Sequence, residues 1–262
     1  MSSRNRMDTR TANPMSLAGR RVLVTGASSG IGRATAVLAA SLGADVVLTG
    51  RRGDELERTR GSMERPDAHS AVAGDLSDSA FVDGLAAQAV AGGRLDGFVH
   101  AAGACAVVPV GMASPAMLAD SLAVGYGAFM LLMRRLSGRN AANRGFSAVA
   151  VSSVSAMAGW PGGSLYAGGK GALNAAVRAL AVELAPKGIR VNAVCPSHVR
   201  TPLFEALTAG ADEFSVAALA AKQPLGIGEP EQIASVACFL LGGASSFVTG
   251  ACIPVDGGYL AQ

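Results

Sequence analysis

One short segment of the chain brings together three side chains that could move a proton. Tyr166 precedes Lys170 by one helical turn, with only small residues between them, and Ser153 lies a short way upstream. Residues at this spacing share one face of a helix, so the lysine ammonium would lie beside the phenol. An unperturbed phenol has a pKa of about 10, and a nearby positive charge lowers that pKa. The three residues therefore indicate general acid–base chemistry at a carbonyl oxygen.

A glycine-rich turn follows the first apolar run and could hold a phosphate. In TGASSGIG the glycines let the backbone turn tightly, approach a pyrophosphate and begin a helix whose N–H groups face the anion. The spacing differs from the GxGxxG fingerprint, and such a turn can be purely structural. Its place after the first strand favours a dinucleotide site. The loop residues expected to contact the cofactor are Gly26, Ser28, Ser29, Gly30, Ile31 and Gly32.

Two arginines follow the second apolar run. An acidic residue at this strand end would bind the ribose 2′-hydroxyl of NAD(H) and repel a 2′-phosphate. Here the strand ends at Gly50, and Arg51 and Arg52 come next. Guanidinium groups suit a 2′-phosphate. The sequence therefore predicts NADP(H) in preference to NAD(H), with solvated surface charges as the alternative interpretation of the two arginines.

These motifs lie within a regular alternation of apolar, β-branched runs and alanine- and leucine-rich stretches. Such runs are typical of parallel strands covered on both faces. The alternation predicts an α/β protein with a Rossmann-type, doubly wound parallel sheet of about seven strands and helices on both faces. The expected strands are 21–26, 45–50, 70–75, 96–101, 147–153, 190–196 and 252–257. The expected helices are 31–42, 53–64, 78–91, 115–137, 164–186 and 230–241.

The 262 residues show no linker and no internal repeat. Residues 1–16 are polar and basic, without the apolar core of a signal peptide, and are expected to form a disordered tail. Residues 17–262 are expected to form one dinucleotide-binding catalytic domain, with a small substrate lid at about 202–225. Ligands of such sheets bind beyond the carboxyl ends of the strands.

Composition limits the partners of this chain. Half of the residues are hydrophobic, 16% are charged and the net charge is +3, so nothing favours nucleic acid or a membrane surface as a partner. The apolar runs are broken well short of the ~20 residues that a membrane span needs. Four scattered cysteines without CxxC spacing indicate buried thiols in a reducing compartment, not disulfides or a metal site. We expect a cytoplasmic enzyme without a metal.

Taken together, these motifs resemble the short-chain dehydrogenase/reductase family, in its single-domain, 3-oxoacyl-reductase-like branch. The resemblance runs from Leu17 to Tyr259 and rests on TGASSGIG, the AAG at 101–103, Ser153, YAGGK and the PVDGG at 254–258. Alone, the Tyr–Lys spacing would arise by chance in many helices. The resemblance implies that Tyr166 is the general acid/base, that Ser153 positions the carbonyl, and that Lys170 holds the nicotinamide ribose and lowers the tyrosine pKa. The family's usual spacing from the tyrosine selects Ser153 over its neighbouring serines.

The resemblance also implies further cofactor contacts. Asp75 matches the acid that contacts the adenine amino group, although it could instead cap a helix, a role for which Ser77 is better placed. Val199 and Thr201 match the positions that hold the nicotinamide carboxamide. The full set of expected cofactor residues beyond the glycine loop is Arg51, Arg52, Asp75, Leu76, Ala101, Ala102, Gly103, Tyr166, Lys170, Val199 and Thr201.

The chain departs from the family pattern at several positions. His100 stands where the NNAG motif begins with asparagine, and we interpret it as a structural hydrogen-bonding substitute, with a catalytic base as the alternative. Ser197 replaces a common glycine, so its hydroxyl and His198 are candidates to face the substrate. Val124 occupies the place of the asparagine that normally holds a water in the proton relay to the lysine, and valine cannot hydrogen-bond. Three interpretations are open: a backbone carbonyl near Val124 with a water replaces the asparagine, catalysis is weakened, or the chemistry is lost. We expect the first, with the carbonyl freed by a kink at Gly125 or Gly127.

These observations predict an NADP(H)-dependent oxidoreductase that interconverts a carbonyl and a secondary alcohol on a neutral or hydrophobic small molecule. Trp160 and Cys105 are further candidates for the pocket wall. Two alternatives stay open: a non-catalytic dinucleotide-binding sensor or interaction protein, and a non-redox dehydratase or isomerase. The helix expected at 115–137 is apolar nearly all round, a face that is commonly a subunit contact on this fold. We therefore expect a homo-oligomer, a tetramer or a dimer.

Overall fold

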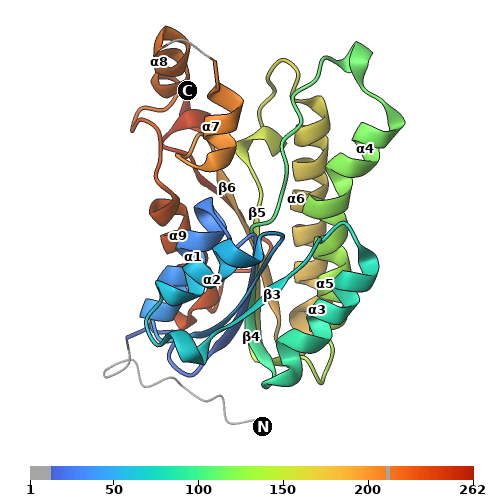
Figure 1. Cartoon of the computed structure of the whole chain (residues 1–262), viewed down its shortest axis with the longest axis vertical. Helices are drawn as coiled ribbons and strands as arrows, with labels where there is room; N and C mark the ends of the chain where they lie inside the picture. Colours follow the sequence, from blue (N-terminus) through green and yellow to red (C-terminus); the bar gives the residue numbers. More distant parts are fainter. Residues whose placement is uncertain (1–12, 211–212) are drawn as a thin grey trace.

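The computed structural model describes residues 13–210 and 213–262, and these form a seven-stranded parallel sheet between two layers of helices (Figure 1). The strands are β1 Arg21–Thr25, β2 Asp45–Gly50, β3 Ser70–Ala73, β4 Leu95–His100, β5 Ala142–Val151, β6 Arg190–Pro196 and β7 Cys252–Val255. Their order across the sheet is β3-β2-β1-β4-β5-β6-β7. The order reverses between β1 and β4, which opens a crevice at the carboxyl ends of these strands. The doubly wound sheet predicted from the sequence is confirmed.

Helices cover both faces of the sheet. Two clusters of buried apolar side chains result, one beneath α3, α5 and α6 and one beneath α1 and α9. The helices are α1 Gly30–Ser41, α2 Gly53–Gly61, α3 Ser79–Ala91, α4 Pro115–Leu122, α5 Ala128–Leu136, α6 Ser164–Leu184, α7 Pro202–Thr208, α8 Glu213–Ala221 and α9 Pro230–Leu241. α7 and α8 lie at the carboxyl end of the sheet, at the top of Figure 1, within the expected lid.

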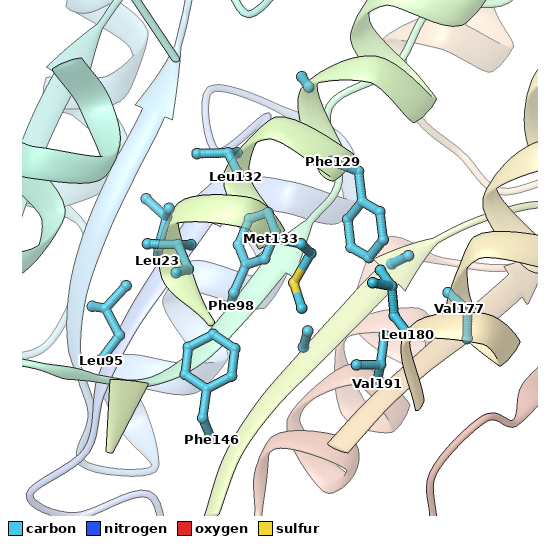
Figure 2. Close-up of a cluster of buried hydrophobic side chains, with 14 of the residues drawn as sticks. Leu23, Leu95, Phe98, Phe129, Leu132, Met133, Phe146, Val177, Leu180 and Val191 are labelled. Carbon is cyan, nitrogen blue, oxygen red and sulfur yellow. The ribbon is translucent and has the colours of Figure 1, made fainter. Parts of the chain in front are cut away.

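The larger cluster fixes α5 onto the middle of the sheet (Figure 2). Phe98 on β4 and Phe129 on α5 stack with their ring centroids 5.9 Å apart, and Leu132 and Met133 are buried beside them. Burying a side chain of this size contributes about 1.5–3 kcal/mol. α5 is therefore firmly held, and the turn that precedes it has a fixed place above β4.

That turn is where the expected helix 115–137 departs from regular geometry. It is divided into α4, a π-helical turn over Ala123–Gly127, and α5. The extra residue of a π turn breaks the regular backbone ladder, and Gly125 and Gly127 within it tolerate the distortion. The irregularity expected at the two glycines is present as this π-helical turn. Gly169 of α6 allows α4 to approach, because a Cβ there would lie 3.0 Å from the Ser121 carbonyl oxygen.

The stretch Pro115–Leu136 is apolar over a greater length than we expected. With a mean hydropathy of 1.6 it is long and apolar enough to cross a membrane, judged by length and composition alone. Its second half is a core helix, since Phe129, Leu132 and Leu136 are fully buried against the sheet. Its first half, α4, is exposed.

Two expectations from the sequence, on the N-terminal tail and on the burial of the cysteines, differ in part from the structure. The first twelve residues of the expected tail lie outside the described residues. Asn13–Ser16 follow, and the Pro14 carbonyl accepts a hydrogen bond from Ala244 N at 3.1 Å, so this part is attached to the domain. All four cysteines are free thiols, but only Cys195 and Cys238 are buried, while Cys105 and Cys252 are partly exposed.

Neither Asp75 nor Ser77 caps α3. The cap is Asp78, whose carboxylate accepts from Ala80 N at 2.8 Å. We expect Asp78→Ala to lower the free energy of unfolding by about 1 kcal/mol, since one helix N–H then loses its acceptor. The melting temperature should fall by roughly 2–4 °C, measured by circular dichroism. Asp78→Asn keeps the acceptor and is the control, and equal melting temperatures for the two variants would contradict the assignment.

Candidate active site

Two adjoining hollows open at the carboxyl ends of the strands. The first, of about 360 Å³, is lined by Ser153, Tyr166 and Lys170 together with residues of the lid. The second, of about 620 Å³, lies over the glycine-rich turn. Both are lined in part by Ile31, Ala101, Gly103 and Thr201, so they form one continuous site.

The three proton-handling residues come from two neighbouring elements. Ser153 leaves β5 and begins a short 3₁₀ turn, and its Oγ accepts from Ser155 N at 3.1 Å. Tyr166 lies in the first turn of α6, and Lys170 one turn later, only 8% exposed. The Lys170 Nζ donates to the Val151 carbonyl at 2.7 Å and lies 5.7 Å from the centroid of the Tyr166 ring. The structure therefore brings the expected trio together.

The electrostatics differ from our expectation that Lys170 lowers the tyrosine pKa. Burial raises the pKa of Tyr166 to about 12, and the hydrogen bond with Ser153 acts in the opposite direction without overcoming it. Burial also lowers the pKa of Lys170 to about 8. The lysine Nζ lies over the face of the ring and donates to the Val151 carbonyl, and burial is the largest influence on the phenol pKa. Tyr166 is thus a neutral phenol at pH 7 and can donate a proton.

Every residue expected to bind the cofactor lines one of the two hollows. Val199, Tyr166 and Lys170 line the first and the remaining ones line the second. The start of α1 is open to an anion, because Ser29 is its N-cap without a capping bond and no acidic side chain stands in its first turn. Gly32 is required for the turn itself, since a Cβ there would lie 2.2 Å from the Gly26 carbonyl oxygen. These features fit a dinucleotide pyrophosphate.

Three charged side chains, those of Arg51, Arg52 and Asp75, line the second hollow. Arg51 and Arg52 are exposed, and neither forms an ion pair with any described residue. The Asp75 carboxylate accepts from Ser77 N and Ser77 Oγ, at 2.9 and 2.8 Å, and these two bonds hold its pKa below the usual value. Asp75 is therefore an ionised acceptor at the edge of the hollow.

The family comparisons agree with this geometry. A family model described as enoyl-(acyl carrier protein) reductase matches residues 26–260. The L-xylulose reductase of Bos taurus is 36% identical over 249 residues, which cover 94% of this chain and 98% of that protein. The chain belongs to the short-chain dehydrogenase/reductase family. The glucose 1-dehydrogenase of Gluconobacter oxydans (strain 621H) is 35% identical and covers 92% of this chain and 92% of its own length.

A solved member of the same family extends the comparison to the cofactor. It is described as an NAD(P)-dependent gluconate 5-dehydrogenase of Beutenbergia cavernae with NADP bound at low occupancy, and it is 34% identical. It matches with a TM-score of 0.86 over 95% of this chain and 100% of its own. The family binds nicotinamide dinucleotides, and its members act on alcohols and carbonyls.

In this dehydrogenase/reductase, His100 and Val124, two residues that depart from the family pattern, are connected by a hydrogen bond. The fully buried His100 donates from Nε2 to the Val124 carbonyl at 3.0 Å, since a carbonyl only accepts. Its Nδ1 then accepts from the Thr25 hydroxyl at 3.0 Å, and Thr25 Oγ1 accepts from Ala102 N at 3.2 Å. Burial, reinforced by the charge of Lys170, lowers the pKa of His100 to about 4 and keeps the imidazole neutral. The carbonyl near Val124 is thus bonded to His100, whereas we expected it unpaired and directed at the lysine.

The remaining wall of the first hollow contains side chains that the sequence predicted, and one of them is held by a residue that it did not predict. Trp160, Cys105, Ser197 and His198 line it, as the sequence suggested. Gln223 was not singled out, although its buried amide holds the His198 ring at 2.8 Å. A glutamine within an apolar lid is a weak signal that only the folded structure explains. No group of three His, Cys, Asp or Glu side chains that could bind a metal occurs within residues 13–210 and 213–262.

Proposed function

We propose that this protein is an NADP(H)-dependent oxidoreductase that interconverts a carbonyl and a secondary alcohol on a neutral or hydrophobic small molecule. The observation that carries the proposal is that Ser153, Tyr166 and Lys170 converge on a hollow that adjoins the nucleotide hollow. The test is to follow NADPH absorbance with a panel of ketones. Consumption that depends on the ketone supports an oxidoreductase, and its absence supports the sensor alternative.

The geometry assigns each residue a task in the proposed reduction. The nicotinamide, when bound, supplies the hydride. Ser153 lies where its hydroxyl can hydrogen-bond the substrate oxygen, and Tyr166, protonated at pH 7, donates its phenolic proton to that oxygen as charge develops. Lys170 lies on the same face of α6 as Tyr166, and its ammonium donates to the Val151 carbonyl. In this position it can hold the ribose. In the reverse direction it is the phenolate form of Tyr166, left after the proton has been given up, that accepts the alcohol proton.

Two observations support NADP(H) over NAD(H). Arg51 and Arg52 are exposed beside the second hollow, and the strand before them ends in Gly50 without an acid. The gluconate 5-dehydrogenase-like structure of the same family was solved with NADP. Guanidinium groups bind phosphate in a bidentate manner that a ribose hydroxyl does not reproduce.

We expect replacement of both arginines by alanine to weaken NADPH binding tenfold to a hundredfold, because a charge-assisted hydrogen bond to phosphate contributes about 1.5–3 kcal/mol. NADH, which lacks the 2′-phosphate, should bind the double variant nearly as well as the native protein. Dissociation constants for both cofactors, measured by fluorescence titration, test the assignment. Arg58→Ala, in the helix α2 that follows the two arginines but outside the hollow, is the control. Equal affinity of the native protein for NADH and NADPH would contradict the proposal.

The walls of the first hollow support a neutral substrate. No Asp or Glu of the described part lines it, and Lys222 at its margin is the one cation there besides Lys170. The apolar lining residues are mainly from the lid and the loop after β4, and include Val107, Trp160, Leu203, Phe204, Leu207 and Leu219. Two of the named relatives, the L-xylulose reductase and the glucose 1-dehydrogenase, are named for neutral sugars, which are molecules of a size that such a hollow accommodates.

We further propose a cytoplasmic homo-oligomer, a tetramer or a dimer. Free thiols suit a reducing compartment. The exposed helix α4 carries Met117 and Leu118, 42% and 51% exposed, which is a typical composition for a subunit contact. Light scattering after gel filtration would measure the assembly, and a monomer would contradict this part of the proposal.

A further inference from the structure

The loop after β6 places an imidazole in the wall of the substrate hollow. His198 is half-buried and lines this hollow. Its ring lies between those of Phe204 and Tyr259, with both centroid distances 5.9 Å. Both aromatic residues line the same hollow. The orientation of the imidazole is therefore fixed by its neighbours.

The hydrogen bonds of Gln223 identify which ring nitrogen carries the proton. Its Nε2 donates to the carbonyls of His198 and Gly226, at 3.2 and 2.9 Å, so its Oε1 must face the histidine. Oε1 accepts from His198 N at 3.0 Å and lies 2.8 Å from His198 Nδ1. An amide oxygen only accepts, so Nδ1 is the protonated nitrogen. In the neutral ring, Nε2 then carries a free lone pair.

This lone pair is available to a ligand. Burial, together with the charge of Lys222, lowers the pKa of His198 although Gln223 opposes the shift, so the ring is neutral at pH 7. Nε2 of His198 has no hydrogen-bonding partner among the described residues. Among those residues, every side-chain nitrogen or oxygen that is fully buried does have a partner, so Nε2 is not fully buried. Nε2 is therefore accessible, and the hollow that His198 lines is the space beside it.

Ser197, the residue before His198, also offers a hydrogen-bond acceptor to a ligand. Ser197 lines the hollow too, and its hydroxyl donates to the Asp256 carbonyl at 2.9 Å. Its proton is thus occupied, and a ligand meets only an oxygen lone pair. Two consecutive side chains present hydrogen-bond acceptors, and neither can act as a donor to the ligand.

We propose that the substrate carries a hydroxyl group in addition to the oxygen that reacts, and that this second hydroxyl donates a hydrogen bond to His198 Nε2. The substrate class is then a hydroxy ketone and the corresponding diol. This inference rests on the proposed function, which places the reacting oxygen at Tyr166. A pocket built to bond a hydroxyl rejects the analogue that lacks it, because the pocket acceptor is then left unpaired.

A binding experiment tests the inference without relying on turnover. Trp160 is the single tryptophan of the chain and lines the hollow, so its fluorescence reports occupancy. Cyclohexanol and the cyclohexane-1,2-, 1,3- and 1,4-diols are titrated into the cofactor-free protein. We expect at least one diol to bind about tenfold more tightly than cyclohexanol, which corresponds to 1.4 kcal/mol. Methylating its second hydroxyl should abolish the preference, since a methoxy group cannot donate.

The matched variant is His198→Phe, which keeps a ring between Phe204 and Tyr259 and leaves the backbone N–H of residue 198 to bond Gln223. It should lose the diol preference, measured as the ratio of diol to cyclohexanol affinity within each protein. The methoxy comparison uses the native protein and decides the question even if the variant does not fold. No diol preference, a preference retained by the methoxy analogue, or one retained by the variant overturns the inference.

Reduction of cyclohexanone and the hydroxycyclohexanones with NADPH, measured in parallel, separates this inference from the proposed function. Diol-selective binding without any turnover supports the hydroxyl site and counts against the oxidoreductase. Turnover without selectivity for a hydroxylated ketone supports the oxidoreductase and overturns the hydroxyl site. Absence of both overturns both.

Discussion

Tyr166→Phe is expected to lower kcat by a factor of about 10²–10⁴ while leaving the dissociation constant of NADPH within a few-fold of its native value. The phenol donates its proton only as the transition state forms, so its loss affects kcat and not cofactor binding. Phenylalanine preserves the ring on which the Lys170 ammonium lies at 5.7 Å. Stopped-flow or steady-state loss of NADPH absorbance with a ketone gives kcat, and fluorescence titration gives the affinity.

The chain offers a matched control for this substitution. Tyr126 lies in the π-helical turn, outside both hollows, so Tyr126→Phe removes the same hydroxyl without touching the site. Its kcat should stay within about twofold of native, because the half-buried Tyr126 lines neither hollow and the change removes only one hydroxyl. Near-native turnover by Tyr166→Phe would contradict the mechanism, and the proton donor would then have to be sought among other groups of the hollow.

Much of the fold was predictable because its signals are local. The strands over 45–50 and 190–196 have the predicted bounds, since a continuous apolar run bounded by charge and glycine is a direct consequence of burial on both faces. The helix caps were less predictable. Asp75, Ser77 and Asp78 are all chemically able to cap α3, but Asp75 and Ser77 bond to each other and Asp78 is the cap.

The site was predictable in its membership and less so in its electrostatics. Spacing brought Ser153, Tyr166 and Lys170 together correctly. The predicted direction of the Tyr166 pKa shift was wrong, because it depends on how deeply the ring is buried, and burial does not follow from spacing in the sequence. The partner of Val124 was missed for the same reason. His100 and Val124 are far apart in sequence and meet only after β4 and α5 pack.

The hydrogen bond between His100 and Val124 carries the second large prediction. His100 connects the cofactor side of the site, through Thr25 and Ala102, to the π-helical turn. Asparagine, the usual family residue at this position, lacks the imidazole Nε2 that donates to the Val124 carbonyl. We expect His100→Asn to lower kcat tenfold to a hundredfold and to destabilise the fold by about 1–3 kcal/mol, the cost of leaving a buried acceptor unpaired.

A stability loss alone could be merely structural, so the control is a second buried histidine. His69 also bonds through both ring nitrogens, to Val46 N at 3.1 Å and to the Glu64 carbonyl at 2.8 Å, but lies outside both hollows. His69→Asn should destabilise the fold by a similar amount and leave kcat unchanged. Equal effects of the two substitutions on kcat would contradict the role of His100 as a positioning residue.

Val124→Asn completes the test, because it restores the family residue on the other side of the bond. Alone it should change activity only modestly, since the new amide enters a site whose carbonyl is already bonded to His100 and whose packing suits an apolar side chain. Combined with His100→Asn it should regain at least tenfold of the lost kcat, a coupling of about 1.4 kcal/mol between the two positions. If the two single effects simply multiply in the double variant, the histidine and the valine are independent.

A hundredfold gain in kcat from Val124→Asn alone, about 2.7 kcal/mol of barrier, would show instead that the native proton relay is broken. We expect the coupled result, because one hydrogen bond joins the two residues that depart from the family pattern.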